Sequence, residues 1–283
     1  MKIDGKSRVC AVIGNPVEHS LSPALHNAAF AEKRLNMCYV AFRVEDLAAA
    51  MAGVRGLNLL GLSVTIPHKV AVLDYLDEVD ETAGRIGSVN TVLHKDGLLI
   101  GYNSDGMGAV RALREADVSL TDEKVTILGS GGAARAIAFT LGKELSLKEL
   151  ILLGIEIEEC SRLAEDLAKA LPFPVRWEPM RPETLGRHVP DSAGIIHCTP
   201  VGMSPHRDQS VLDRQILRPG QWVFDIVYNP LKTRLLQEAE SAGCRIVRGV
   251  EMFIHQAVFQ FELWTGEPAP VDCMRRVVMG ALS

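Results

Sequence analysis

Three polar segments stand out in the first part of the chain, because hydroxyl, amide, amino and carboxyl side chains gather there in otherwise apolar surroundings. They are Asn15–Pro23, Ser63–Lys69 and Gly101–Gly106. Each segment follows a strand-like run and precedes a helical pattern. In an open α/β sheet, ligands bind at this edge, beyond the carboxyl ends of the strands. Such groups converging there would suit a polyhydroxylated small molecule, neutral or anionic.

Each of these residues also has an ordinary structural explanation. Ser22 before Pro23 is a natural helix N-cap with Pro at the first helical position. Lys69 alone would be a solvated lysine at a helix start, and Asp105 alone a capping or turn residue. The eight histidines and six cysteines show no metal-ligand spacing, so no metal site is expected. Only the joint occurrence of the polar segments favours a ligand site.

A second kind of site follows the apolar run Val125–Leu128. Residues 129–134, GSGGAA, have the spacing G-x-G-x-x-A and open a helical pattern, which is the context that dinucleotide-binding turns require. Gly129 would permit the tight turn, Gly131 would let backbone amides approach a pyrophosphate, and Ala134 would allow close helix packing. The sequence therefore predicts a dinucleotide site here.

The elements that must position these groups alternate between strands and helices. Strand-like runs at 9–14, 38–44 and 59–66 alternate with helical patterns, the last a helical stretch to about Ile86, and Lys95-Asp96-Gly97 marks an antiparallel hairpin near the sheet edge. A second series has strand-like runs at 125–128, 150–153, 194–197, 222–226 and 245–247. The closing helical segments, 252–264 and 271–281, have no strand left to connect and are expected to cover the first domain.

This pattern predicts an α/β fold with two domains, which the length of 283 residues also favours. Residues 1–105 with 250–283 would form an N-terminal α/β substrate-binding and catalytic domain. Residues 106–249 would form a Rossmann-type, doubly wound dinucleotide-binding domain.

Composition narrows the class of partner. The net charge of −5 comes without a run of Lys or Arg that could track phosphates, so the expected partner is a small molecule and not nucleic acid. Neither a signal peptide nor a membrane-spanning run is found, and the cysteines fit reduced core thiols. The expected location is the cytoplasm, with no membrane partner, and monomer and homodimer both remain open.

Seven segments, in this order and spacing, resemble the successive signatures of shikimate dehydrogenases and their quinate dehydrogenase relatives: VIGNPVEHSLSPALHNAAF, SVTIPHK, IGSVNT, GYNSDG, LGSGGAARA, DIVYNP and GVEMFIHQA. The resemblance extends from about residue 9 to residue 266. It implies an oxidoreductase that uses NADP or NAD to interconvert 3-dehydroshikimate and shikimate in aromatic amino acid biosynthesis.

The resemblance also implies roles for individual residues. Lys69 matches the family's acid/base lysine, with Asp105 orienting the same hydroxyl. Ser20 and Ser22 match the pair that binds the substrate carboxylate. The other substrate contacts would be Thr65, Asn90, Asp105, Tyr228 and Gln256. The cofactor contacts would be Glu81, Gly129, Ser130, Gly131, Gly132, Ala133, Val227 and Gly249.

Three positions depart from the family pattern. Ser63 stands where the family commonly has Asn, and His197-Cys198-Thr199 replaces the usual Asn-Ala-Thr near the nicotinamide. The Asn-Arg-Thr that follows the second strand of the cofactor domain in NADP-dependent members is absent. Here that strand leads into the acidic segment Glu156–Glu159, although Arg162 can be aligned with a more distant family arginine.

The acidic segment and the family resemblance favour different cofactors. The usual cofactor of the family is NADP, whereas acidic residues at this place favour NAD. Glu156 lies near the spacing at which an acidic residue bonds the free ribose 2′-hydroxyl of NAD, and carboxylates there would repel a 2′-phosphate. The alternative is that these glutamates complement the dipole of the next helix and point into water. We expect NAD to be used at least as well as NADP, with Glu156 and Arg162 contacting the cofactor.

Other functions remain open beside this one. A quinate/shikimate dehydrogenase that works catabolically with NAD carries the same signatures. A nucleotide-sensing relative without turnover is a second alternative, which the retention of Lys69 and Asp105 argues against. A folate-type dehydrogenase of similar build is a third, and the Ser20-Leu21-Ser22 segment argues against it.

Overall fold

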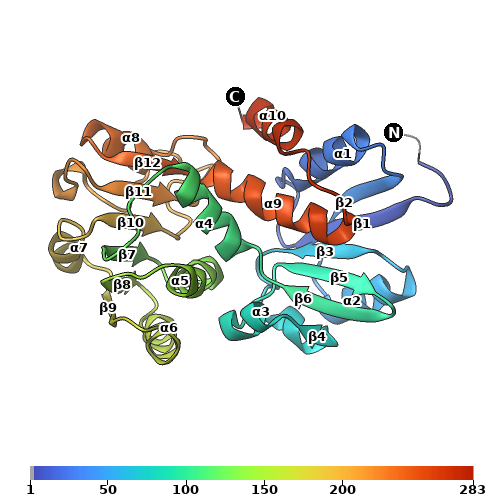
Figure 1. Ribbon diagram of the computed structural model, residues 1–283, viewed down its shortest axis with the longest axis horizontal. Helices are drawn as coiled ribbons and strands as arrows, with labels where there is room; N and C mark the ends of the chain where they lie inside the picture. The colour runs from blue at the N-terminus through green and yellow to red at the C-terminus, as the bar shows by residue number, and fades with distance from the viewer. Residues whose placement is uncertain (1–2, 283) are drawn as a thin grey trace. The chain divides into compact units, whose positions relative to one another are not determined.

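The computed structural model describes residues 3–282, which form two compact α/β units (Figure 1). Unit 1 combines Met1–Ser104 with Ile254–Ser283, and unit 2 is Asp105–Phe253. The sequence places the boundaries after residues 105 and 249. In the structure the first boundary comes one residue earlier, after Ser104. The second comes after Phe253, inside helix α9 (Gly249–Thr265), because this helix continues unbroken from one unit into the other.

Unit 1 is built on a mixed sheet in the strand order β2-β1-β3-β5-β6-β4. Its strands are β1 (Arg8–Gly14), β2 (Met37–Arg43), β3 (Gly61–Val64), β4 (Glu78–Val79), β5 (Thr91–Lys95) and β6 (Leu98–Tyr102). Its helices are α1 (Ser22–Glu32), α2 (Leu47–Gly56), the 3₁₀ helix η1 (Ala71–Tyr75), α3 (Glu81–Ile86), most of α9, and α10 (Val271–Leu282). Strands β1, β2 and β3 run parallel, and β5 runs antiparallel to β3 and β6.

The hairpin between β5 and β6 forms where the sequence predicts it. Asp96 and Gly97 make its two-residue turn with φ of 53° and 82°, the left-handed pair that a tight hairpin with right-handed strand twist requires. The hairpin lies next to the sheet edge, which β4 forms by pairing parallel to β6.

The helical stretch predicted up to Ile86 is wrong in its middle. Only η1 and α3 are helical, and β4 lies between them. The Asp77 carboxylate accounts for the break, because Oδ2 accepts a 2.6 Å hydrogen bond from the backbone N–H of Leu99 on β6 and a 2.7 Å bond from Arg55. These bonds draw the chain to the edge of the sheet, where it continues as a strand.

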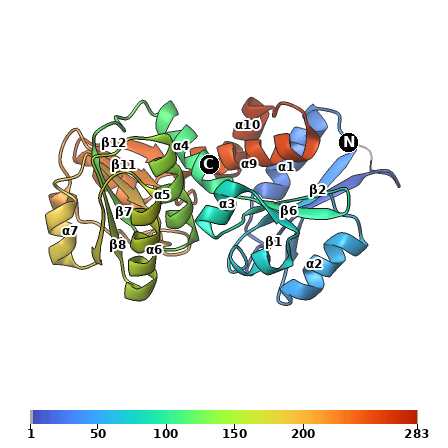
Figure 2. The same ribbon diagram turned by 60° about the horizontal axis from the view of Figure 1, so that its bottom comes forward.

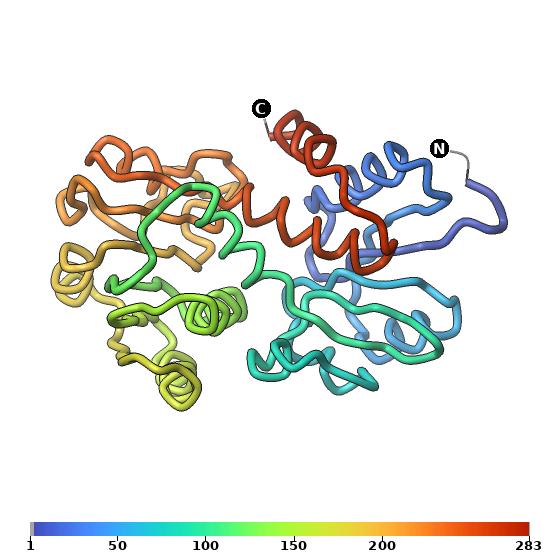
Figure 3. Tube along the Cα trace, viewed as in Figure 1, coloured from blue at the N-terminus to red at the C-terminus, as the bar shows by residue number. Residues whose placement is uncertain are grey.

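Helices cover both faces of the unit 1 sheet, as Figure 2 shows, with α1, α9 and α10 on one side and α2 on the other. Figure 3 traces the C-terminal segment back to the N-terminal helix α1, as the sequence predicts. The ring centroids of Phe30 and Phe261 lie 5.6 Å apart, and the Trp264 indole N–H donates a 3.1 Å hydrogen bond to the Val92 carbonyl. Gly61 must lack a side chain, because a Cβ there would collide with Trp264.

Unit 2 is a doubly wound parallel sheet in the order β12-β11-β10-β7-β8-β9, as predicted. Its strands are β7 (Lys124–Leu128), β8 (Glu149–Gly154), β9 (Val175–Pro179), β10 (Gly194–His197), β11 (Trp222–Asp225) and β12 (Arg245–Arg248). Its helices are α4 (Asp105–Glu115), α5 (Gly132–Glu144), α6 (Ile157–Ala170), α7 (Pro182–His188), η2 (Arg214–Ile216) and α8 (Arg234–Ser241).

The sequence pattern predicts neither β9 nor α7. Strand β9 lies at the sheet edge and is only partly buried, so its sequence VRWEP lacks the apolar run of an inner strand. Helix α7 is short and begins at a proline. No helix in the described part of the chain is long and apolar enough to cross a membrane.

Candidate active site

The polar segments of unit 1 meet at one edge of its sheet. The Asn15 N–H, after β1, donates a 2.9 Å hydrogen bond to the Ile66 carbonyl, after β3. The Val89 N–H donates a 2.8 Å bond to the Lys69 carbonyl, and the Asn90 N–H donates a 3.1 Å bond to the Tyr102 carbonyl. Backbone hydrogen bonds therefore hold these loops side by side beyond the strand ends.

The Ser20–Ser22 segment opens helix α1, but Ser22 does not cap it. The N-cap is Leu21, Ser22 is the first helical residue, and no side chain caps the helix. The Ser20 hydroxyl instead accepts a 3.3 Å hydrogen bond from the Ser22 backbone N–H, and Ser22 is 5% exposed. The capping explanation of Ser22 is wrong, because a cap must lie one residue earlier to reach the first free N–H groups.

Thr65 and Lys69 lie on the loop that follows β3. The Thr65 N–H donates a 2.9 Å hydrogen bond to the Ile13 carbonyl, and the Thr65 carbonyl accepts a 2.9 Å bond from the His68 N–H. His68 is buried, and its Nε2 lies 3.0 Å from the Val44 carbonyl oxygen. These contacts hold the short loop rigidly, and both Thr65 and Lys69 are half-buried on it.

Asn90 and Asp105 are buried, with 3% and 6% of their surface exposed. Asn90 Oδ1 accepts a 2.9 Å hydrogen bond from the Ser104 backbone N–H, which anchors the residue directly before Asp105. Asp105 is the first residue of α4, where the helix dipole favours a carboxylate. It belongs to unit 2, whereas Lys69 belongs to unit 1.

Three further predicted site residues differ in how firmly they are held. Gln256 is half-buried on α9. The Tyr228 ring stacks on Phe253, with centroids 4.6 Å apart, and burial raises the pKa of its phenol. Glu81 is exposed at the start of α3 and forms a surface ion pair with Arg85 at 2.7 Å. A role of Glu81 at the nucleotide stays a prediction.

The glycine-rich turn between β7 and α5 has the geometry that a dinucleotide site needs. Gly129 has a φ of +109°, which only glycine adopts easily, and a Cβ there would press on Cys198 and Thr199 at 3.1 Å. Gly131 is the N-cap of α5, so the free N–H groups of the helix start point out of the turn. Ala134 is fully buried, as close packing of helix on strand requires. The residues present therefore fit a bound pyrophosphate.

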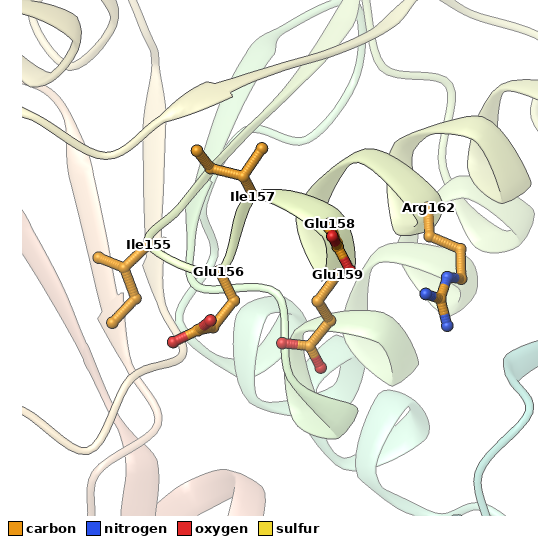
Figure 4. A pocket seen from close by; sticks show the side chains of 6 residues that line it. All are labelled: Ile155, Glu156, Ile157, Glu158, Glu159 and Arg162. Carbon is orange, nitrogen blue, oxygen red and sulfur yellow. The ribbon is translucent and has the colours of Figure 1, made fainter.

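The acidic segment lies beside this turn and lines a depression of about 570 Å³ (Figure 4). Glu156 is the N-cap residue of α6, but its side chain makes no capping hydrogen bond. The Ser130 hydroxyl of the turn donates a 3.1 Å hydrogen bond to Glu159 Oε2. Figure 4 shows the side chains of Glu156 and Glu159 on the same side of the segment, with Arg162 further along α6. Glu159 is thus the acid in contact with the turn, which spacing alone did not single out.

The carboxyl ends of β10 and β11 hold a buried His–Asp pair to which the sequence motifs assign no role. His197 Nδ1 lies 2.9 Å from Asp225 Oδ1, which also accepts a 3.0 Å hydrogen bond from the Val227 N–H. Gly249 packs against this segment, because a Cβ there would collide with the Ile226 and Val227 carbonyl oxygens. The only signal in the sequence was the departure from Asn at position 197.

A doubly wound unit with a dinucleotide turn, joined to a unit whose polar sheet edge carries hydroxyl, amide and lysine side chains, defines a dinucleotide-dependent oxidoreductase. Comparison with known proteins identifies the family. The model described as shikimate dehydrogenase substrate binding domain matches residues 12–92, and that of the shikimate 5′-dehydrogenase C-terminal domain matches residues 249–279.

Relatives that match along nearly the whole chain support the same family assignment. The shikimate dehydrogenase (NADP(+)) of Moorella thermoacetica is 43% identical, over 100% of this chain and 96% of its own. Shikimate 5-dehydrogenase from Listeria monocytogenes, solved with shikimate and NAD, has a TM-score of 0.92 at 35% identity and 98% coverage of both chains. Quinate dehydrogenase from Corynebacterium glutamicum, solved with NAD, has a TM-score of 0.90 at 30% identity, covering 97% of this chain and 99% of its own. The chain belongs to the shikimate dehydrogenase family, as its motifs predict, and is an oxidoreductase acting on a CH–OH group.

Proposed function

We propose that the protein is a cytoplasmic shikimate dehydrogenase that interconverts 3-dehydroshikimate and shikimate. The observation that carries the proposal is the joining of the Asn15–Pro23, Ser63–Lys69 and Asn90 segments at one edge of the unit 1 sheet, through the hydrogen bonds from Asn15 N–H to the Ile66 carbonyl and from Val64 N–H to the Asn90 carbonyl. This edge offers hydroxyl, amide and ammonium groups, which suit a ring with several hydroxyls and one carboxylate. The relative from Moorella thermoacetica carries the name of the same activity.

Each group then has a chemical task. A bound reduced nicotinamide supplies the hydride that goes to the ring carbonyl carbon. The Lys69 ammonium donates a proton to the carbonyl oxygen as that oxygen gains charge, so that the ketone becomes an alcohol. Asp105 accepts a hydrogen bond from the hydroxyl and orients it, and in the oxidative direction Lys69 takes the proton back.

The substrate carboxylate is held by neutral donors. The Ser20 and Ser22 hydroxyls donate hydrogen bonds to it, and the rigid start of α1 fixes their spacing. Thr65, Asn90, Gln256 and Tyr228 contact the ring side of the substrate. Ser22 and Asn90 are buried, which strengthens their hydrogen bonds because little water competes for them.

NAD is used at least as well as NADP. Glu156 and Glu159 lie on the same side of the segment after β8, and Glu159 touches the dinucleotide turn through Ser130. A carboxylate there accepts hydrogen bonds from a free ribose hydroxyl, whereas it repels the 2′-phosphate of NADP. Arg162 lies further along α6 and is the only positively charged side chain among the residues that line the depression.

Steady-state kinetics of the purified protein test both parts of the proposal. Shikimate and quinate are each assayed with NAD and with NADP. We expect kcat/KM for shikimate to exceed that for quinate, and NAD to be at least as effective as NADP. A preference for quinate would assign the protein to the quinate/shikimate dehydrogenases. A preference of a hundredfold or more for NADP would overturn the cofactor assignment.

A further inference from the structure

A buried chain of hydrogen-bonded polar side chains in unit 1 leads to the loops beyond the strand ends that hold Asn15–Pro23, Ser63–Lys69 and Asn90, here called the substrate edge. Its members are Tyr39, Ser63, Gln260 and Thr91, which are 1%, 6%, 1% and 0% exposed. The chain ends at Asn90, a substrate contact under the proposed function. Successive distances are 2.6 Å from the Tyr39 phenol to Ser63 Oγ, 2.9 Å from Ser63 Oγ to Gln260 Oε1, 2.9 Å from Gln260 Nε2 to Thr91 Oγ1, and 2.8 Å from Thr91 Oγ1 to Asn90 Oδ1.

The Asn90 end of the chain fixes which atom of the amide is the oxygen. The backbone N–H of Ser104 lies 2.9 Å from Asn90 Oδ1. A backbone N–H can only donate, so the amide end that faces it must be the oxygen. The Thr91 hydroxyl donates to the same oxygen. The Asn90 NH₂ group lies on the other side of the amide, where one of its hydrogens is donated to Ser104 Oγ at 3.0 Å.

The far end of the chain fixes the direction of the remaining bonds. The Tyr39 phenol donates its hydrogen to Ser63 Oγ, and burial keeps the phenol protonated by raising its pKa. A hydroxyl has one hydrogen, and that of Ser63 therefore goes to Gln260 Oε1. The Gln260 NH₂ group then faces Thr91, whose own single hydrogen goes to Asn90. Every bond points the same way, and each polarises the next.

We propose that this chain fixes the Asn90 side chain so that its NH₂ group, and not its oxygen, binds a substrate hydroxyl. A substrate hydroxyl that accepts a hydrogen bond from Asn90 can still donate its own hydrogen. The proposed acceptor of that hydrogen is the Asp105 carboxylate. Ser63 stands where the family commonly has Asn, and it can serve as a link because one oxygen both accepts and donates. Tyr39, Ser63, Gln260 and Thr91 are accordingly positioning residues, and the inference rests on the proposed role of Asn90.

Thr91→Val tests the chain, because it removes the hydroxyl next to Asn90 and keeps the shape of the side chain. We expect KM for shikimate to rise about tenfold, kcat to change less, and KM for the nucleotide to stay the same. Thr91→Ser restores the hydroxyl and should restore KM. Thr126→Val is the matched control, since Thr126 is a fully buried strand residue of unit 2 whose hydroxyl lies 2.7 Å from Ser192 Oγ. It should lower Tm without changing KM for shikimate.

A double-mutant cycle separates positioning from loss of packing. In an Asn90→Ala background, Thr91→Val should add no further rise in KM for shikimate. Additive effects of the two substitutions would overturn the inference and leave the proposed function intact. An unchanged KM in Asn90→Ala alone would overturn the proposed role of Asn90, and the inference with it. If Thr91→Val does not fold, Ser63→Ala breaks the chain two links earlier and is tested in the same cycle.

Discussion

His197 Nδ1 lies 2.9 Å from Asp225 Oδ1, and both side chains are fully buried. The second carboxylate oxygen of Asp225 accepts a 2.5 Å hydrogen bond from the Thr233 hydroxyl. The pair joins the ends of β10 and β11 and holds the Val227 N–H, so it fixes the backbone on which a cofactor contact is proposed.

Asp225→Ala should therefore lower the free energy of unfolding by about 3–5 kcal/mol, because it leaves the His197, Val227 and Thr233 donors buried without their acceptor. Urea denaturation measures this loss. His197→Asn, which introduces the usual family residue, should cost less, since an amide N–H can still bond Asp225. A loss of less than about 1 kcal/mol for Asp225→Ala would show that the pair is not structural.

Lys69→Ala and Asp105→Asn should each lower kcat by about two to four orders of magnitude, the usual range for a positioned proton-transfer group. Both variants should fold, since Lys69 is half-buried on a loop held by its backbone and Asn retains the shape of Asp105. Circular dichroism and Tm provide the control. Wild-type turnover in both variants would contradict the catalytic assignment.

Ser20→Ala with Ser22→Ala should raise KM for shikimate strongly, because a hydrogen bond to a charged group contributes about 1.5–3 kcal/mol. Helix α1 should be retained, because neither hydroxyl caps it. The KM for the nucleotide serves as an internal control. Normal shikimate binding combined with early melting would mean that the two serines support structure instead of substrate.

Glu156→Gln with Glu159→Gln should shift the ratio of kcat/KM values toward NADP, by about tenfold or more, because an unfavourable charge pair near the surface contributes up to about 4 kcal/mol before screening. The ratio is measured with shikimate held constant. Glu158→Gln, in the same first turn of α6, is the matched control and should shift the ratio less. An equal shift in the control would point to the general field of the helix start and not to contact with the ribose.

Stability should fall as the pH falls below about 6.5, and His26 is one cause. Burial lowers the pKa of its imidazole to about 3, with Gln260 opposing only part of the effect. Between these two values the unfolded chain binds a proton that the folded chain does not, so His26 costs about 1.4 kcal/mol per pH unit on acidification. His26→Phe removes this proton while keeping a flat ring on Tyr39, where the histidine now stacks at 4.5 Å. Urea titrations between pH 7 and pH 4 should give a flatter pH dependence for the variant, and parallel curves would exclude His26 as the source.

The local elements of this protein were determined by its sequence. The Asp96-Gly97 turn, the GSGGAA turn and the alternating apolar runs each depend on neighbours in the chain, so propensity and periodicity suffice to predict them. The motifs of the substrate edge were found in the same way, because each follows the end of a strand. The break at Asp77 was not, since its cause is a hydrogen bond to a strand further along the chain.

Tertiary structure alone decided which of these groups meet. Ser63 and Gln260 are 197 residues apart, yet they bond at 2.9 Å, and Ser130 in the turn before α5 bonds Glu159 on the following helix, α6. The sequence marked Glu156 by spacing, but the packing of α6 on the sheet sets which carboxylate touches the turn. The same holds for His197 and Asp225, which lie on neighbouring parallel strands. Spacing along the chain cannot predict such contacts, because they depend on strand order and register, which are set only when the sheet assembles.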